Sequence, residues 1–125
     1  MFSLDLHSRE PIYEQLYNRV LDLAASGVMK ENEQLPPVRV LAKELGVNPN
    51  TVQKAYQELE RNGIIYSQGG RGSFIAASNE VSAVAKRNAH EKFTDATQKA
   101  LLAGYTKNEL KQIIDKTEQK GESTE

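Results

Sequence analysis

The 125-residue sequence contains no cysteine, so it can form neither a disulfide framework nor a metal site with thiolate ligands. Its only histidines, His7 and His90, have no second histidine or carboxylate around them at the spacing of a metal site. We therefore interpret both as surface side chains, and we expect the protein to need no metal or other cofactor.

Long hydrophobic runs are also missing, and no apolar stretch approaches the roughly 18 residues that a membrane-spanning helix needs. The first residues, MFSLDLHSREP, lack the basic flank and the apolar core of a signal peptide. With 38% hydrophobic and 26% charged residues, the composition is typical of a soluble globular protein. We expect a cytoplasmic protein with either one domain of ordinary size or one small domain of about 75 residues and an appendage, and no large ligand-binding domain.

The chain also has no excess of positive charge. The chain has 16 Lys and Arg against 17 Asp and Glu, which gives a net charge of −1, whereas a general phosphate binder usually has a strong basic excess. Contact with nucleic acid must therefore come from a local face. Between residues 34 and 57, Arg39, Lys43 and Lys54 are accompanied by Glu44 alone, a local balance of 3 − 1 = +2.

The sequence also lacks a catalytic constellation. The segment GGRG at 69–72 does not have the Lys-Ser/Thr end of a phosphate-binding loop, and it stands between two β-prone runs rather than before a helix. The carboxylates are spread over polar helix faces without a motif that would pair them. We therefore expect no enzymatic activity.

The clearest pattern that is present lies in LGVNPNTVQKAYQELERNG, residues 45–63. Asn48 suits the N-cap of a helix, Pro49 suits its first position and Gly63 suits its end, so we predict a helix from about 49 to 62. Four apolar residues at i, i+3, i+4 and i+7 form one buried face. These residues are Val52, Ala55, Tyr56 and Leu59.

The opposite face of this predicted helix carries amides and cations with no carboxylate at its centre. On its own, such a face is typical of a solvated surface helix, so its interpretation depends on the neighbouring segments. The face consists of Asn50, Gln53, Lys54, Gln57 and Arg61.

The neighbouring segments predict a winged helix-turn-helix. An amphipathic helix between Pro11 and Gly27 is followed by a two-turn helix at 38–45, and Gly46 then allows the tight turn into the helix at 49–62. After it, IIYSQ and SFIAA are two β-prone runs joined by GGRG, which predicts a hairpin. The fold class is therefore mostly α with a small β-hairpin, whose tip can reach DNA beside the third helix.

From Ser78 the pattern changes. Apolar residues recur at steps of three or four up to Gly104, which predicts a fourth helix with an alanine-rich stripe. The sequence TKNE at 106–109 is a capping-box pattern that predicts the start of a fifth helix. The polar tail TEQKGESTE, at 117–125, is expected to be frayed. The stripe consists of Val81, Ala85, Ala89, Phe93, Ala96, Ala100 and Ala103.

The two C-terminal helices have too few large apolar residues to build a core alone, but small side chains allow two helices to approach closely. We predict a homodimer, with a winged domain at 1–77 and a dimerisation region at 78–125. The alternative is that the two helices fold back onto their own winged domain. The predicted dimerisation residues are Ala85, Ala89, Phe93, Ala96, Ala100, Leu110, Ile113 and Ile114.

Four segments resemble, in order and spacing, the GntR family of bacterial transcription regulators: PIYEQL, QLPPVRVLA, LGVNPNTVQKAYQELERNGII and GGRGSFIA, spread over residues 11–76. The short C-terminal region and the NPNT segment are similar to the YtrA subfamily, which has a small dimerisation appendage in place of a larger effector domain. The resemblance implies a sequence-specific regulator of double-stranded DNA, a repressor that binds an inverted-repeat operator as a homodimer.

The resemblance also implies which residues contact DNA. The start of the third helix enters the major groove, where its exposed amide NH groups attract a phosphate, and Arg39 and Arg71 hold the backbone on either side. Lys54 is added from the polar face of the helix. The positions carried over from the family are Arg39, Asn48, Pro49, Asn50, Thr51, Gln53, Gly70 and Arg71.

Two positions depart from the family pattern. Pro37 stands where many relatives have Ser, which removes a side-chain cap from the second helix but still suits its first turn. Pro49 stands where many relatives have Arg, which removes a bidentate reader of guanine and leaves amides that suit adenine. We therefore expect a preference for A·T pairs.

One further alternative is a winged helix used for protein contacts, since this fold serves both purposes. It predicts an exposed apolar face on the third helix. A small-molecule effector would need a pocket between the appendages of the dimer, and no residue pattern indicates one.

Overall fold

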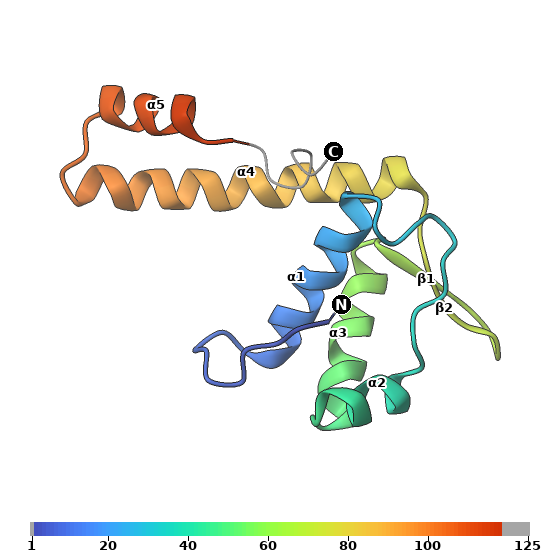
Figure 1. The fold of residues 1–125 in the computed structure, drawn as a ribbon. Helices are drawn as coiled ribbons and strands as arrows, with labels where there is room; N and C mark the ends of the chain where they lie inside the picture. Colours follow the sequence, from blue (N-terminus) through green and yellow to red (C-terminus); the bar gives the residue numbers. More distant parts are fainter. Residues whose placement is uncertain (1, 119–125) are drawn as a thin grey trace. The chain divides into compact units, whose positions relative to one another are not determined.

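The computed structural model describes residues 2–118, which form five helices and one two-stranded antiparallel sheet. This confirms the predicted class, mostly α with a small β-hairpin (Figure 1). The elements are α1 (Ile12–Ala25), α2 (Val38–Leu45), α3 (Pro49–Arg61), β1 (Ile65–Gln68), β2 (Gly72–Ile75), α4 (Ser78–Leu102) and α5 (Lys107–Lys116).

The helix-turn-helix is formed by α2, a tight turn and α3. Gly46 ends α2 in the left-handed region at φ +71°, a conformation that glycine adopts without strain. Val47 N then donates to the carbonyl of Ala42 at 3.0 Å, and Asn48 caps α3 by accepting a hydrogen bond from Asn50 N at 2.8 Å. The glycine and the cap fix the angle at which α3 leaves α2.

The start of α2 shows the effect of Pro37. Pro37 occupies the N-cap position and no side chain caps this helix, as its sequence predicted. The helix nevertheless forms, because Leu41 N donates to the Pro37 carbonyl at 3.0 Å and the side chains of Leu41 and Ala42 are each 1% exposed. Burial replaces the missing cap.

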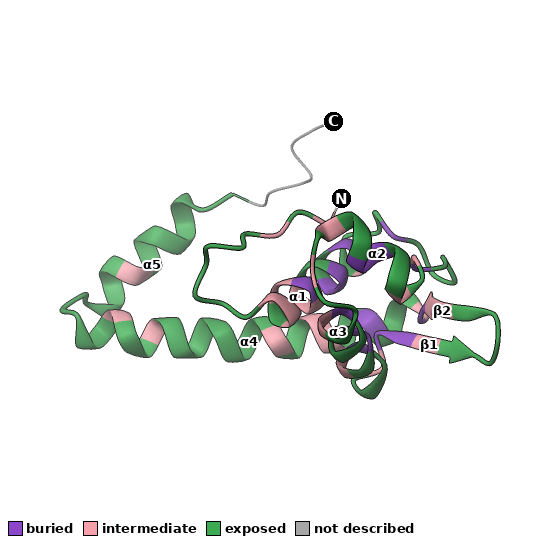
Figure 2. Ribbon diagram, turned by 90° about the horizontal axis from the view of Figure 1, so that it is seen from below, coloured by how far each residue is buried: buried purple, intermediate pink, exposed green. Residues whose placement is uncertain are grey.

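The hydrophobic core is built by α1, α2, α3, the hairpin and the start of α4. All four apolar residues predicted for α3 are buried, and α3 packs against both α1 and α2. Figure 2 shows the buried residues concentrated in these elements. The largest fully buried side chains are Leu16, Leu41, Leu59, Ile64, Ile75, Val20, Val52 and Val81.

The hairpin pairs Ile65 with Ile75 and Tyr66 with Phe74, whose rings stack with centroids 5.6 Å apart. The segment 32–35 runs along the other edge of β2, which the sequence analysis did not predict. Leu35 N donates to the Ser73 carbonyl at 2.8 Å. Asn32 N donates to the Ile75 carbonyl at 2.8 Å, and Ile75 N donates to the Glu33 carbonyl at 2.9 Å. The wing is therefore held from both sides of β2.

The chain divides into two compact units within α4, the first ending at Ala85 and the second beginning at Lys86. The sequence pattern predicts this boundary at 77/78, and α4 does begin at Ser78. The first two turns of α4 belong to the first unit, because Val81 is 1% exposed in its core and Ala85 packs against that core. A boundary inside a continuous helix has no turn residue to indicate it.

In the second unit, α5 begins with the predicted capping box. Thr106 Oγ1 accepts from Glu109 N at 3.1 Å, and Glu109 Oε1 accepts from Thr106 N at 2.8 Å. Of the predicted frayed tail, residues 119–125 lie outside the described part of the chain. Between residues 2 and 118, no helix is long and apolar enough to cross a membrane, and no three His, Asp or Glu side chains form a group able to hold a metal ion.

Candidate nucleic-acid interface

The N-terminal half of α3 presents the predicted reading surface. Asn48, Pro49, Asn50 and Gln53 are exposed and Thr51 is half-buried, while the apolar side of the helix is at most 5% exposed. Within residues 2–118, no hydrogen bond engages the side-chain amides of Asn50 or Gln53. Their donors and acceptors are therefore available to base edges.

The expected attraction of a phosphate to free amide NH groups at this helix end is wrong. Pro49 has no NH group, and Asn50 N already donates to Asn48 Oδ1 at 2.8 Å. Thr51 N donates to the Asn48 carbonyl at 2.9 Å. The same cap that starts the helix uses these donors, so contact with DNA at this end must come from side chains.

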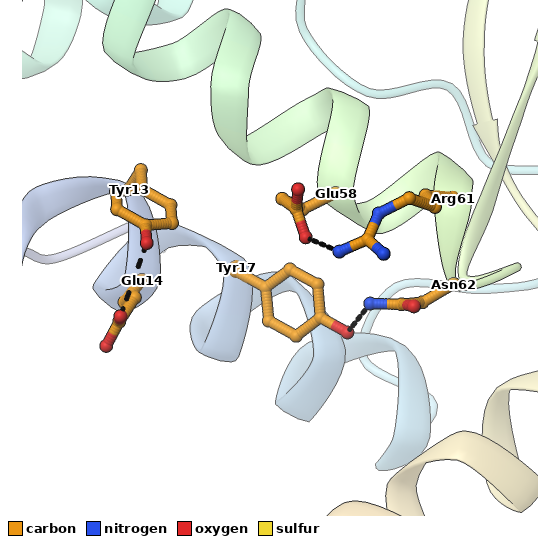
Figure 3. Close-up of polar contacts among 6 residues, drawn as sticks. All are labelled: Tyr13, Glu14, Tyr17, Glu58, Arg61 and Asn62. Atoms are coloured by element: carbon orange, nitrogen blue, oxygen red, sulfur yellow. Dashed lines mark hydrogen bonds and ion pairs between the residues drawn. The ribbon is translucent and has the colours of Figure 1, made fainter.

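The C-terminal half of α3 is engaged within the protein, as Figure 3 shows. Arg61 forms an ion pair and a hydrogen bond with Glu58, which raise the pKa of Arg61, and Asn62 Nδ2 donates to the Tyr17 hydroxyl at 2.8 Å. The Tyr13 hydroxyl in the same view donates to Glu14 at 3.4 Å. The cation that the sequence placed at this end of the polar face is thus paired, whereas the side chain of Gln57, one turn before it, is exposed and forms no hydrogen bond within residues 2–118.

Lys54 takes a position that the sequence did not predict. Its Nζ lies 3.8 Å from the centroid of the Tyr13 ring, a cation–π contact between α3 and the start of α1. Such a contact contributes about 0.5–1 kcal/mol at an exposed site and restrains a long, flexible side chain. The ammonium group is therefore held at the edge of the α3 face, where a point charge suits a phosphate better than a base edge.

Two arginines lie outside α3. Arg39 is exposed on the first turn of α2, and Arg71 is exposed at the tip of the wing. Neither guanidinium forms an ion pair within residues 2–118. At the tip, Arg71 N donates to the Gln68 carbonyl at 2.8 Å, and Gly70 takes φ +75° at the third position of the turn, where a type II turn requires a positive φ.

The second unit contains an apolar groove between α4 and α5, with a volume of about 370 Å³. Six of the eight predicted dimerisation residues line it: Phe93, Ala96, Ala100, Leu110, Ile113 and Ile114. The other two do not, because Ala85 packs on the core of the first unit and Ala89 is an exposed residue outside the groove. The stripe predicted as one surface is therefore divided between the two units.

The helix-turn-helix and the wing match a known protein family. The model of the gntR family of bacterial regulatory proteins matches residues 12–75, which contain the helix-turn-helix and the wing. The chain belongs to the GntR family. It is a DNA-binding transcription regulator of that family, and the family and relatives are regulators rather than enzymes, as its sequence predicted.

Individual relatives extend the comparison. The HTH-type transcriptional repressor YtrA of Bacillus subtilis is 45% identical over 84 residues, 67% of this chain, which confirms the resemblance to the YtrA subfamily. The chain spans 65% of the length of that relative. A GntR family transcriptional regulator from Listeria monocytogenes is 28% identical with a TM-score of 0.76, over 92% of this chain and all of that one.

A second similar structure contains DNA. It is AraR(DBD) in complex with operator ORE1, with a TM-score of 0.52 and 27% identity over 59% of this chain and 90% of that chain. A protein with a similar fold has therefore been solved in complex with operator DNA.

Proposed function

We propose that this GntR-family chain is a repressor that binds an inverted-repeat operator in double-stranded DNA as a homodimer. The observation that carries the proposal is the asymmetry of α3. Its apolar side anchors it to α1 and α2, Arg61 at its C-terminal end is paired with Glu58, and its N-terminal amides are exposed and unpaired. A helix positioned in this way suits the major groove, which it enters with its N-terminal residues first.

The contacts fall into two classes in this proposal. Asn50 and Gln53 read base edges, and a side-chain amide pairs best with N6 and N7 of adenine, which supports the preference for A·T pairs. Arg39, Lys54 and Arg71 contact phosphates and set the register of the protein on the duplex. The start of α3 is shaped by Asn48, Pro49 and Thr51, and the wing tip is shaped by Gly70. These residues allow the protein backbone to approach the DNA closely.

The apolar groove supports the homodimer. Phe93, Ile113 and Ile114 leave 57%, 49% and 50% of their surface exposed in the single chain, and monomeric proteins rarely leave such side chains adjacent to one another. A second copy of the same surface covers them symmetrically. Dimerisation places two α3 helices on half-sites about one helical turn apart and doubles the phosphate contacts of a chain with a net charge of −1.

Repression is proposed from the printed name of the B. subtilis relative, and a cytoplasmic location from the proposed contact with bacterial DNA. An effector that releases the protein from DNA is compatible with this proposal, and the polar side chains that line the groove are Thr97, Lys107 and Lys111.

The alternative of a winged helix used only for protein contacts predicts exposed apolar residues on α3. Its apolar residues are instead buried, with Val52, Ala55 and Leu59 at 0% exposure. The geometry therefore favours DNA over protein as the partner of α3.

Selection of duplexes from a random pool tests the proposal, followed by titration of the double variant Gln53→Ala with Lys54→Ala. We expect A·T-rich inverted repeats and a loss of binding in the double variant with unchanged circular dichroism. The matched control, Gln98→Ala with Lys86→Ala, replaces an exposed glutamine and an exposed lysine of α4 and should bind like the parent. Unchanged DNA binding by the double variant supports the protein-contact alternative, and G·C-rich half-sites contradict the base preference.

A further inference from the structure

Within residues 2–118, the wing tip accepts one hydrogen bond from a side chain outside the hairpin. Gln34 Nε2 donates to the main-chain carbonyl of Arg71 at 2.8 Å, although the two residues are 37 positions apart in the sequence. Gln34 lies opposite Phe74 where the segment 32–35 pairs with β2. Side chains two residues apart on a strand share a face, so the Gln34 amide extends over Gly72, two residues before Phe74.

Gly72 provides the space for this contact. A Cβ at Gly72 would lie 2.7 Å from Gln34 Nε2, closer than such atoms approach in proteins. Its φ of +115° also requires glycine, so the missing side chain and the backbone conformation act together. The Gln34 side chain thus occupies the position that a side chain of β2 would otherwise take.

The two glycines of the tip have open space around them. Gly69 and Gly70 have no heavy atom within 4 Å of a Cβ position, and across the turn Arg71 N donates to the Gln68 carbonyl at 2.8 Å. Glycines give a turn more conformational freedom than any other residue. The bond from Gln34 restrains the main chain of the one charged residue that this tip presents, because Arg71 is the only Lys, Arg, Asp or Glu between Ile65 and Ile75.

We propose that Gln34 is a positioning residue for DNA binding, which fixes the wing tip so that Arg71 meets a phosphate. The inference rests on the proposed function, in which Arg71 contacts the DNA backbone. Gln34 acts through the Arg71 carbonyl and makes no essential contact with DNA itself. A contact group that is held in place before binding loses less entropy on binding, which is the source of the affinity that Gln34 contributes.

The first test measures the wing tip in the free protein. The chain has no cysteine, so Gly69→Cys gives a single site for a nitroxide label, at a glycine with open space and no need for a positive φ. Gln34→Met keeps the length of the side chain and removes its donor. We expect Gln34→Met to increase the mobility of the label in electron paramagnetic resonance spectra, and Gln98→Met, at an exposed position on α4, to leave it unchanged. Unaltered mobility in Gln34→Met overturns the proposal.

The second test is a double-mutant cycle on the affinity for the duplex recovered from a random 30-base-pair pool. We expect Gln34→Met to weaken binding about two- to tenfold, the range of one hydrogen bond, when Arg71 is present. In the Arg71→Ala background, we expect the same substitution to leave affinity nearly unchanged, because the residue it positions is gone. Since the bond is exposed, the melting temperature should change by less than about 3 °C.

Two results of the cycle overturn the proposal. An equal loss of affinity in both backgrounds shows that Gln34 acts on DNA without Arg71, and the absence of a loss in the presence of Arg71 shows that the anchor is dispensable. Both results leave the proposed function intact. A parent chain that binds no duplex at any salt concentration contradicts the proposed function itself and, with it, the role of Gln34 in DNA binding.

Discussion

The substitution Ile113→Asp tests the proposed homodimer. Ile113 lines the apolar groove of the second unit and keeps 49% of its surface exposed in the single chain. Complete burial of an isoleucine side chain contributes about 1.5–3 kcal/mol, so covering the exposed half contributes about 1 kcal/mol in each protomer. An unpaired carboxylate in the same place adds several kcal/mol of desolvation cost.

Two-fold symmetry makes each substitution act twice. The total loss is therefore at least about 4 kcal/mol, which raises the dissociation constant of the dimer about a thousandfold. The fold of the monomer should survive, because a half-exposed position is altered and surface substitutions usually change stability by less than about 0.5 kcal/mol. Sedimentation velocity across a concentration series measures the dimer, and circular dichroism measures the helices.

The matched control for this experiment is Gln112→Asp. Gln112 is the neighbouring residue of α5, is exposed and does not line the groove, so its substitution adds the same charge without entering the contact. We expect Gln112→Asp to remain dimeric while Ile113→Asp becomes monomeric. A parent chain that is monomeric at all concentrations, or an Ile113→Asp chain that stays dimeric, refutes the reasoning.

Two further predictions concern stability and DNA contacts. Burial raises the pKa of Tyr56 above its usual value of 10, so the folded state keeps this proton where the unfolded chain loses it. Stability from this group is complete below pH 10 and falls above it by up to about 1.4 kcal/mol per pH unit. Tyr56→Phe removes the hydroxyl and its 2.6 Å hydrogen bond to the Pro36 carbonyl, so we expect this variant to lose about 1 kcal/mol of stability at neutral pH and to show no fall in stability above pH 10. Urea unfolding at several pH values measures both effects. An equal fall in the stability of the parent and the variant above pH 10 would contradict this prediction. Arg39→Ala should weaken the binding of all duplexes about equally and lower the slope of log affinity against log salt concentration by about 1. Arg87→Ala is the control. A loss of affinity confined to one base position would assign Arg39 to base reading instead.

The local elements of the winged domain could be predicted from the sequence because each carries its own signal. Asn48 and Pro49 mark the start of α3, Gly46 marks the turn before it, and the pattern at 106–109 marks the start of α5. Each of these signals acts through hydrogen bonds within a few residues. Their positions in the sequence therefore translate directly into structure.

Contacts between distant segments could not be predicted in the same way. The bond from Gln34 to Arg71 and the contact of Lys54 with Tyr13 depend on how the elements pack, and no periodic pattern records them. The pairing of Arg61 with Glu58 is different, because residues three apart on a helix are neighbours and the pair was visible in the sequence.

The central claim is that the first half of the polar face of α3 meets base edges while the second half does not. The most direct test is to titrate the isotope-labelled protein with a selected duplex and to monitor its backbone-amide and side-chain NMR signals. We predict that the largest shifts fall on Asn50, Thr51 and Gln53, with smaller shifts at Arg71 and none along α5. Shifts concentrated on the groove of the second unit, or spread evenly over the protein, would contradict the account.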